Sequence, residues 1–227
     1  QVALPAIAAI GGMAIPAAIY LAFNVNDPIA AKGWAIPAAT DIVLALAFLA
    51  LLGPRVPIAL KVFLTALAIF DDFGTLVIIA AFYSGELSAF AMMLALAGIA
   101  AAMLLNRMRV TQTAAYLLVG VLLWVTLLKS GVHATLAGVA LAFCIPMRVD
   151  GKEILKQIEH DLSPWVGFGV VPVFAFFNAG IELGGSAIAS LLEPISLGVV
   201  LGLFLGKQLG VFASARAAVW MGLASLP

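Results

Sequence analysis

The chain has 227 residues, of which 65% are hydrophobic and only 10% are charged. A water-soluble domain carries about 25% charged residues, so this composition excludes a soluble globular protein and indicates a protein of the lipid bilayer. Eleven basic residues balance eleven acidic ones. This balance leaves no basic surface for nucleic acid, which we exclude as a partner.

Apolar runs divide the chain into segments of the length that a transmembrane helix needs, about 20 residues. Irregular backbone cannot face lipid, and the alternating pattern of a barrel is absent, so we predict an all-α polytopic protein with about eight spans. The predicted helices lie near residues 2–23, 34–52, 57–83, 88–105, 112–128, 131–147, 158–181 and 195–220. The polar stretch 148–161 is predicted to be a connection, and residues 1–227 are predicted to form a single transmembrane domain.

Lysine and arginine residues in alternate connections predict the orientation in the membrane. One side carries eight of them and the other side two: Arg55, Lys61, Arg107, Arg109, Arg148, Lys152, Lys156 and Arg216 against Lys32 and Lys129. We therefore expect the eight-charge side, with both ends of this chain, to face the cytoplasm. The single Cys144 lies in an apolar run, and we interpret it as a small buried hydrophobe.

The predicted helix 34–52 contains a proline and an acid close together. Pro37 removes a backbone donor and disfavours helix at the residue before it, so the helix is expected to break near Pro37 to Asp41. Such a break frees carbonyls and half-helix ends that bind ions in transporters. Asp41 is a candidate ion-binding acid, while Thr40 either caps a helix or supplies an ion ligand.

Two adjacent acids, Asp71 and Asp72, lie near the middle of the predicted helix 57–83. A central Asp costs about 2.5 to 3.5 kcal/mol on insertion, which the protein retains only if a partner, solvation or a bound ion offsets it. Adjacent helical residues point about 100° apart, so each acid can serve a different partner. Carboxylate oxygens suit a hard cation such as sodium, and protons compete for the same atoms. We therefore consider both acids as ion-binding and proton-binding residues.

Lys207 lies near the middle of the predicted helix 195–220 and is the candidate charge partner of an acid. Four glycines recur beside it at every fourth residue, namely Gly198, Gly202, Gly206 and Gly210. They form a ridge against which another helix can pack closely. A buried Asp–Lys pair that only holds helices together stays open as an alternative, although one lysine cannot neutralise three acids.

Five stretches in this order resemble the NhaA family of bacterial sodium/proton antiporters: WAIPAATDI (34–42), ALAIFDDFG (66–74), LKSGVHATLAG (128–138), FAFFNAG (174–180) and LGKQLG (205–210). The resemblance implies that Asp72 is the sodium-ligating acid and that Asp71 binds ion or proton and alternately pairs with Lys207. It places Asp41 and Thr40 at a crossing of two unwound helices. The stretch KQIEHDLSPW (156–165) resembles the family's pH-sensing region, which implies sensing roles for Glu159 and Lys156, with His133 as a further contributor.

The family has a twelve-helix core with inverted repeats, and the match runs from about the third helix to the tenth. We therefore expect further helices before residue 1 and after residue 227 in the parent protein. The implied function is electrogenic, pH-regulated exchange of cytoplasmic sodium or lithium for external protons, without a cofactor or an enzymatic reaction. The resemblance also implies the cell inner membrane as the location, and the expected partners are its bilayer, the ions and a second copy in a homodimer. A sodium-coupled solute symporter and a non-transporting membrane scaffold are the alternatives.

Overall fold

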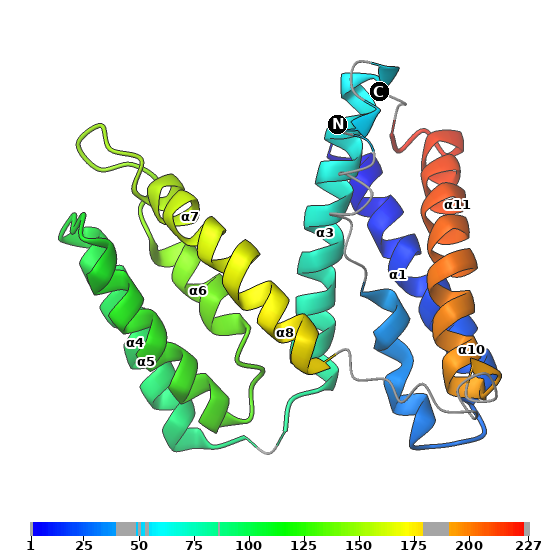
Figure 1. Cartoon of the computed structure of the whole chain (residues 1–227), viewed down its shortest axis with the longest axis horizontal. Coiled ribbons are helices and arrows are strands. Elements are labelled where there is room, and N and C mark those ends of the chain that lie inside the picture. The colour runs from blue at the N-terminus through cyan, green and yellow to red at the C-terminus, as the bar shows by residue number, and fades with distance from the viewer. Residues whose placement is uncertain are drawn as a thin grey trace. The chain divides into compact units, whose positions relative to one another are not determined.

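The computed structural model describes residues 2–39, 49, 51–52, 55–85, 87–178 and 191–224. Helices make up almost all of this described part, and the only β-type pairing in it is an isolated bridge between Val149 and Lys152 (Figure 1). The all-α prediction is confirmed.

Five described helices are long and apolar enough to cross a membrane. They are α1 (Ala3–Asn24), α3 (Ile58–Phe82), α4 (Ala89–Arg107), α5 (Thr113–Ser130) and the composite helix Pro194–Trp220. The composite helix consists of α10 (Pro194–Leu201), the π-helical segment η4 (Gly202–Gly206) and α11 (Lys207–Trp220). These helices confirm five of the eight predicted segments, with boundaries that agree to within a few residues.

Two further segments differ from the prediction. The helix predicted at 131–147 is only nine residues long, α6 (Leu136–Cys144). Gly131 ends α5 in the left-handed conformation with φ of 82°. The chain then turns until Thr135, and Ile145 is extended before Pro146, as expected for a residue that precedes proline.

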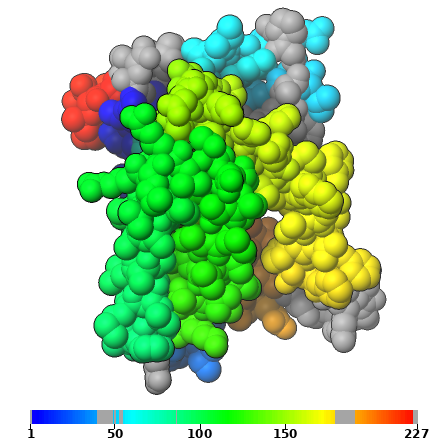
Figure 2. All heavy atoms as spheres, turned by 90° about the vertical axis from the view of Figure 1, so that its left-hand side faces the viewer, coloured from blue at the N-terminus to red at the C-terminus, as the bar shows by residue number. Residues whose placement is uncertain are grey.

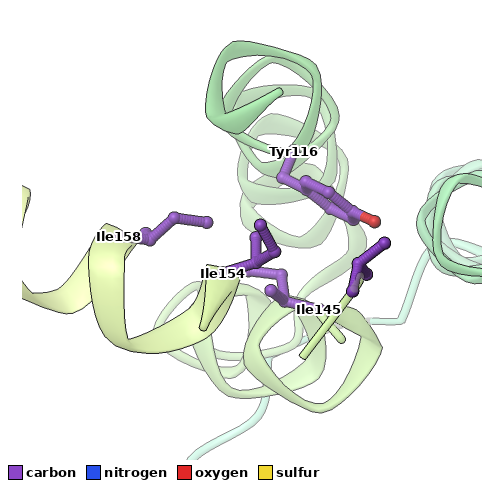
Figure 3. Close-up of a cluster of buried hydrophobic side chains, with 5 residues drawn as sticks. Tyr116, Ile145, Ile154 and Ile158 are labelled. Carbon is purple, nitrogen blue, oxygen red and sulfur yellow. The ribbon is translucent and has the colours of Figure 1, made fainter. Parts of the chain in front are cut away.

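The predicted connection 148–161 is wrong from Ile154 onward, because α7 (Ile154–Trp165) occupies that stretch. The π-helical segment η3 (Val166–Val170) and α8 (Val171–Asn178) continue this helix. Figure 3 shows the cause: Ile154 and Ile158 turn toward Tyr116 and Ile145 in a buried cluster. A polar stretch with one apolar stripe forms an amphipathic helix that packs on its neighbours.

The chain forms two compact units, residues 1–79 with 183–227 and residues 80–182. In the second unit, α4, α5 and α6 pack through Ala95, Leu123, Leu127 and Ala137. Figure 2 shows these helices in green, with the α7–α8 segment beside them in yellow. In the first unit, α1, α3 and α11 meet around Ala8, Ala9 and Leu67.

The glycine ridge of the composite helix packs against α1 and against the 3-10 helix η1 (Ala30–Ala38) in the first unit. All four glycines are buried. A Cβ atom at Gly206 would lie 2.9 Å from the Cα of Pro16, and one at Gly202 would lie 2.9 Å from the Cβ of Pro37. Only glycine permits this approach, which confirms the predicted ridge.

Candidate functional site

Asp71 forms a buried ion pair with Lys207 inside the first unit. The Nζ atom of Lys207 lies 2.5 Å from Oδ1 of Asp71, and the two side chains are 12% and 1% exposed. Asp71 follows Leu67 by one helical turn, and Leu67 is part of the core where α1, α3 and α11 meet. The helical repeat of α3 therefore turns Asp71 toward α11, where Lys207 is the first residue.

Lys207 has a second oxygen partner at a helix end. Its Nζ donates a hydrogen bond of 3.0 Å to the backbone carbonyl of Ala38. Ala38 is the last residue of η1, and Ala39 is extended with ψ of 127°. The final carbonyls of a helix lack partners within it and carry partial negative charge, so they suit an ammonium group. The 3-10 helix thus ends within the stretch where the helix was predicted to break, while Thr40 and Asp41 lie outside the described residues.

Two backbone features lie beside the Lys207 side chain. The π-helical segment Gly202–Gly206 ends directly before Lys207 and changes the direction in which the following residues point. Gly12 of α1 lies against the lysine stem: a Cβ atom there would be in ordinary contact, at 3.6 Å, with Cδ and Cε of Lys207, and would lie only 2.8 Å from Cγ2 of Val211. Sequence reasoning missed the Ala38 carbonyl and Gly12; the glycine-rich stretch before Lys207 was the only signal of an irregular helix.

Asp72 follows Asp71 on α3 but points about 100° away from it. Its side chain belongs to an exposed face of the helix, whereas Asp71 is buried. The ion pair of Lys207 is with Asp71. The two acids thus have different surroundings, and their oxygens, with the Ala38 carbonyl, are ligands of the kind that hard cations prefer.

The residues proposed as pH sensors lie at separate places in the second unit. Lys156 pairs with Glu153 at 3.4 Å, and Arg148 also binds this carboxylate through Nε at 3.1 Å. Hydrogen bonds from Arg148 and Lys156 lower the pKa of the Glu153 carboxyl below its ordinary value. Glu159 is exposed on α7.

His133 lies in the turn before α6, whereas Lys156 and Glu159 lie beyond the other end of that helix. The Nδ1 atom of His133 is 2.9 Å from Oγ1 of Thr135, and its side chain is exposed. The structure therefore does not bring His133 together with Lys156 and Glu159. Their sensing roles stay predictions.

Several apolar helices, a helix end at Ala38 and a buried ion pair in the middle of two spanning segments define a multi-span α-helical membrane protein with ionisable groups inside its helices. A sequence model described as "Na+/H+ antiporter 1" matches residues 1–227. The chain belongs to this family of sodium/proton antiporters, as the resemblance in its sequence indicated.

Curated relatives carry the name Na(+)/H(+) antiporter NhaA. The protein from Maricaulis maris is 64% identical over 201 residues, which is 88% of this chain and 50% of the relative. The protein from Shewanella pealeana is 56% identical over 228 residues, covering all of this chain and 58% of the relative. One from a Sulfurovum species is 53% identical over 232 residues. The chain thus spans between half and three fifths of the length of the relatives it matches.

Proposed function

We propose that the complete protein containing this chain exchanges cytoplasmic sodium or lithium for external protons. The observation that carries the proposal is the buried Asp71–Lys207 pair beside the end of η1. Membership of the sodium/proton antiporter family supports it. The relatives' names favour this function over sodium-coupled symport and over a scaffold without transport.

Charge balance gives the mechanism. Asp71 is almost fully buried, and a buried carboxylate needs one positive partner at a time. Lys207, a proton and a sodium ion compete for that place. Sodium binds to Asp72 and Asp71, with Asp41 and Thr40 completing the site, and it releases Lys207 from Asp71. Protonation of Asp72 then displaces the sodium ion and lets Lys207 pair with Asp71 again, so a single site that opens alternately to each side exchanges sodium for protons.

Further parts of the proposal concern surroundings and control. The protein lies in the inner membrane with the side rich in lysine and arginine in the cytoplasm. Glu159 and Lys156, with a contribution from His133, adjust activity to pH. A homodimer is the proposed assembly, and the reaction needs no cofactor.

The test is sodium-driven proton movement in inside-out membrane vesicles from cells that express the complete protein. Adding sodium should dissipate a preformed pH gradient with the wild type and should not do so with Asp72→Asn. The matched control is Asp150→Asn, which removes the charge of an aspartate that is 75% exposed and pairs with Arg109 only at the surface. Full activity of Asp72→Asn would refute the assignment.

Exchange in the wild type should rise steeply toward alkaline pH as the acids lose protons, and a flat profile would contradict the proposed competition.

A further inference from the structure

Thr75 has a buried hydroxyl that makes no hydrogen bond in the described part of the chain. Four serine and threonine hydroxyls in or next to described helices behave differently: those of Thr65, Ser84, Thr126 and Ser130 each donate to a backbone carbonyl three or four residues earlier, at 2.7 to 2.9 Å. Thr75 could bond in the same way to the carbonyl of Asp71 but does not. A buried hydroxyl without a partner costs about 1 to 3 kcal/mol. This position therefore carries a polar oxygen whose partner is not the helix itself.

The helical repeat places Thr75 between the two acids. With 3.6 residues per turn, Thr75 points about 40° from the direction of Asp71 and about 60° from that of Asp72. It lies one turn further along α3 (Ile58–Phe82) than the acids. Helical side chains lean toward the N-terminus of their helix, so the Thr75 side chain leans toward the turn that carries Asp71 and Asp72. Thr75 thus lies on the side of α3 between the directions of the two carboxylates.

We propose that Oγ1 of Thr75 is a neutral oxygen ligand of the cation that Asp71 and Asp72 bind. This inference rests on the proposed function and adds a residue to its site. Hard cations prefer several oxygen ligands, and a hydroxyl supplies one without adding a negative charge to the membrane interior. Because this hydroxyl does not titrate in the working range of pH, it strengthens binding of the cation and leaves the proton affinity of the carboxylates unchanged.

The experiment compares sodium affinity in the complete protein with and without the hydroxyl. Thr75→Val keeps the branched shape and removes the oxygen, while Thr75→Ser keeps the oxygen. Thr65→Val is the matched control, since Thr65 lies on the same helix, is exposed and already bonds to the carbonyl of Lys61. The apparent KM for sodium is measured in inside-out vesicles at several pH values, with sodium binding to the purified protein measured by calorimetry.

Thr75→Val should raise the apparent KM about threefold to tenfold, as expected for the loss of one polar contact. The factor should be the same at every pH, because only sodium affinity changes, and calorimetry should show the same loss. Thr75→Ser and Thr65→Val should behave like the wild type. Thr75→Ala should reproduce Thr75→Val, which covers the case in which the valine variant does not fold.

Three results would overturn the inference. The first is an unchanged KM for sodium in Thr75→Val and Thr75→Ala. The second is a ratio of variant to wild-type KM that varies with pH, and the third is a Thr75→Ser variant as impaired as Thr75→Val. The proposed function fails separately, if the wild type shows no sodium-driven proton movement. A wild type that exchanges, an inactive Asp72→Asn and a normal Thr75→Val would leave the function standing and refute the role of Thr75 alone.

Discussion

Lys207 connects two elements of the first unit through two oxygens, Oδ1 of Asp71 and the carbonyl of Ala38. The ammonium group is therefore held on one side by a partner that can change its charge and on the other by a backbone dipole that cannot. If Asp71 takes up a proton or an ion, the Ala38 carbonyl still holds Lys207 beside the site. A pair that served only to join helices would also show this geometry, so variants must distinguish stability from transport.

Removing one partner of the ion pair should destabilise the protein more than removing both. Lys207→Gln leaves the nearly fully buried carboxylate of Asp71 without its cation, which costs about 3 to 5 kcal/mol. The double variant Lys207→Gln with Asp71→Asn replaces the ion pair with neutral groups of similar size and should recover much of this loss. The measurement is the midpoint of thermal unfolding of the complete protein in detergent.

The single Asp71→Asn variant completes the double-mutant cycle for this pair. Strictly additive shifts of the midpoint would mean that the two residues do not interact. Loss of transport in a double variant that regains its stability would show that the pair does more than join helices.

The sequence predicted Asp71 and Lys207 because charges in the middle of an apolar run are rare and need a reason. The helical pattern alone could not show which acid faces the lysine, since that depends on how α3 is rotated against α11, and only the family resemblance assigned this role to Asp71. The Ala38 carbonyl was beyond prediction for a simpler reason, because every residue carries the same backbone carbonyl. Asp41 and Thr40 lie outside the described residues, and their roles stay predictions.

At the scale of the elements, long apolar runs fix helix positions well, and α1, α3, α4 and α5 begin and end near the predicted residues. The N-terminus of α4 also has a local signal, as the Ser88 side chain accepts a hydrogen bond from the backbone of Ala91. The prediction fails where tertiary packing decides, as in α7, whose polar stretch buries one apolar stripe. The π-helical segments left no sequence pattern specific enough to predict them.

Enlarging one ridge glycine should disturb the helix packing that places Lys207. A Cβ atom at Gly206 would lie 2.9 Å from the Cα of Pro16 and 3.0 Å from Cδ1 of Ile19, so Gly206→Ala must separate α1 from the composite helix. Such overpacking costs about 1 to 3 kcal/mol. We expect a lower midpoint of thermal unfolding and slower exchange.

Gly138→Ala in α6 is the matched control, because a Cβ atom there meets nothing within 4 Å. Alanine is the better helix former by up to about 1 kcal/mol, so this variant should be as stable as the wild type or slightly more so. Equal midpoints for Gly206→Ala and the wild type would show that the ridge does not set the distance between the helices.

At the scale of the whole molecule, the second unit lets the orientation be tested without any assumption about the first. Antiparallel α4 and α5 place the connection before α4 at one end of the unit and the connection with Arg107 and Arg109 at the other. The connection from α6 to α7 lies at the same end as that basic connection, since α6 returns along α4 and α5 (Figure 1). Charge then predicts that this basic end is cytoplasmic.

Cysteine labelling of the complete protein measures this orientation. The background is Cys144→Ala, which removes the buried native cysteine of this chain. Any other cysteine that the complete protein contains is replaced as well. Leu87 is 64% exposed before α4, and the side chain of Asp150 is 75% exposed between α6 and α7. A membrane-impermeant maleimide should label Leu87→Cys in intact cells and Asp150→Cys only in inside-out vesicles. The reverse pattern would show that the protein has the opposite orientation. The Asp71–Asp72 site would then have to take up sodium from the other side of the membrane.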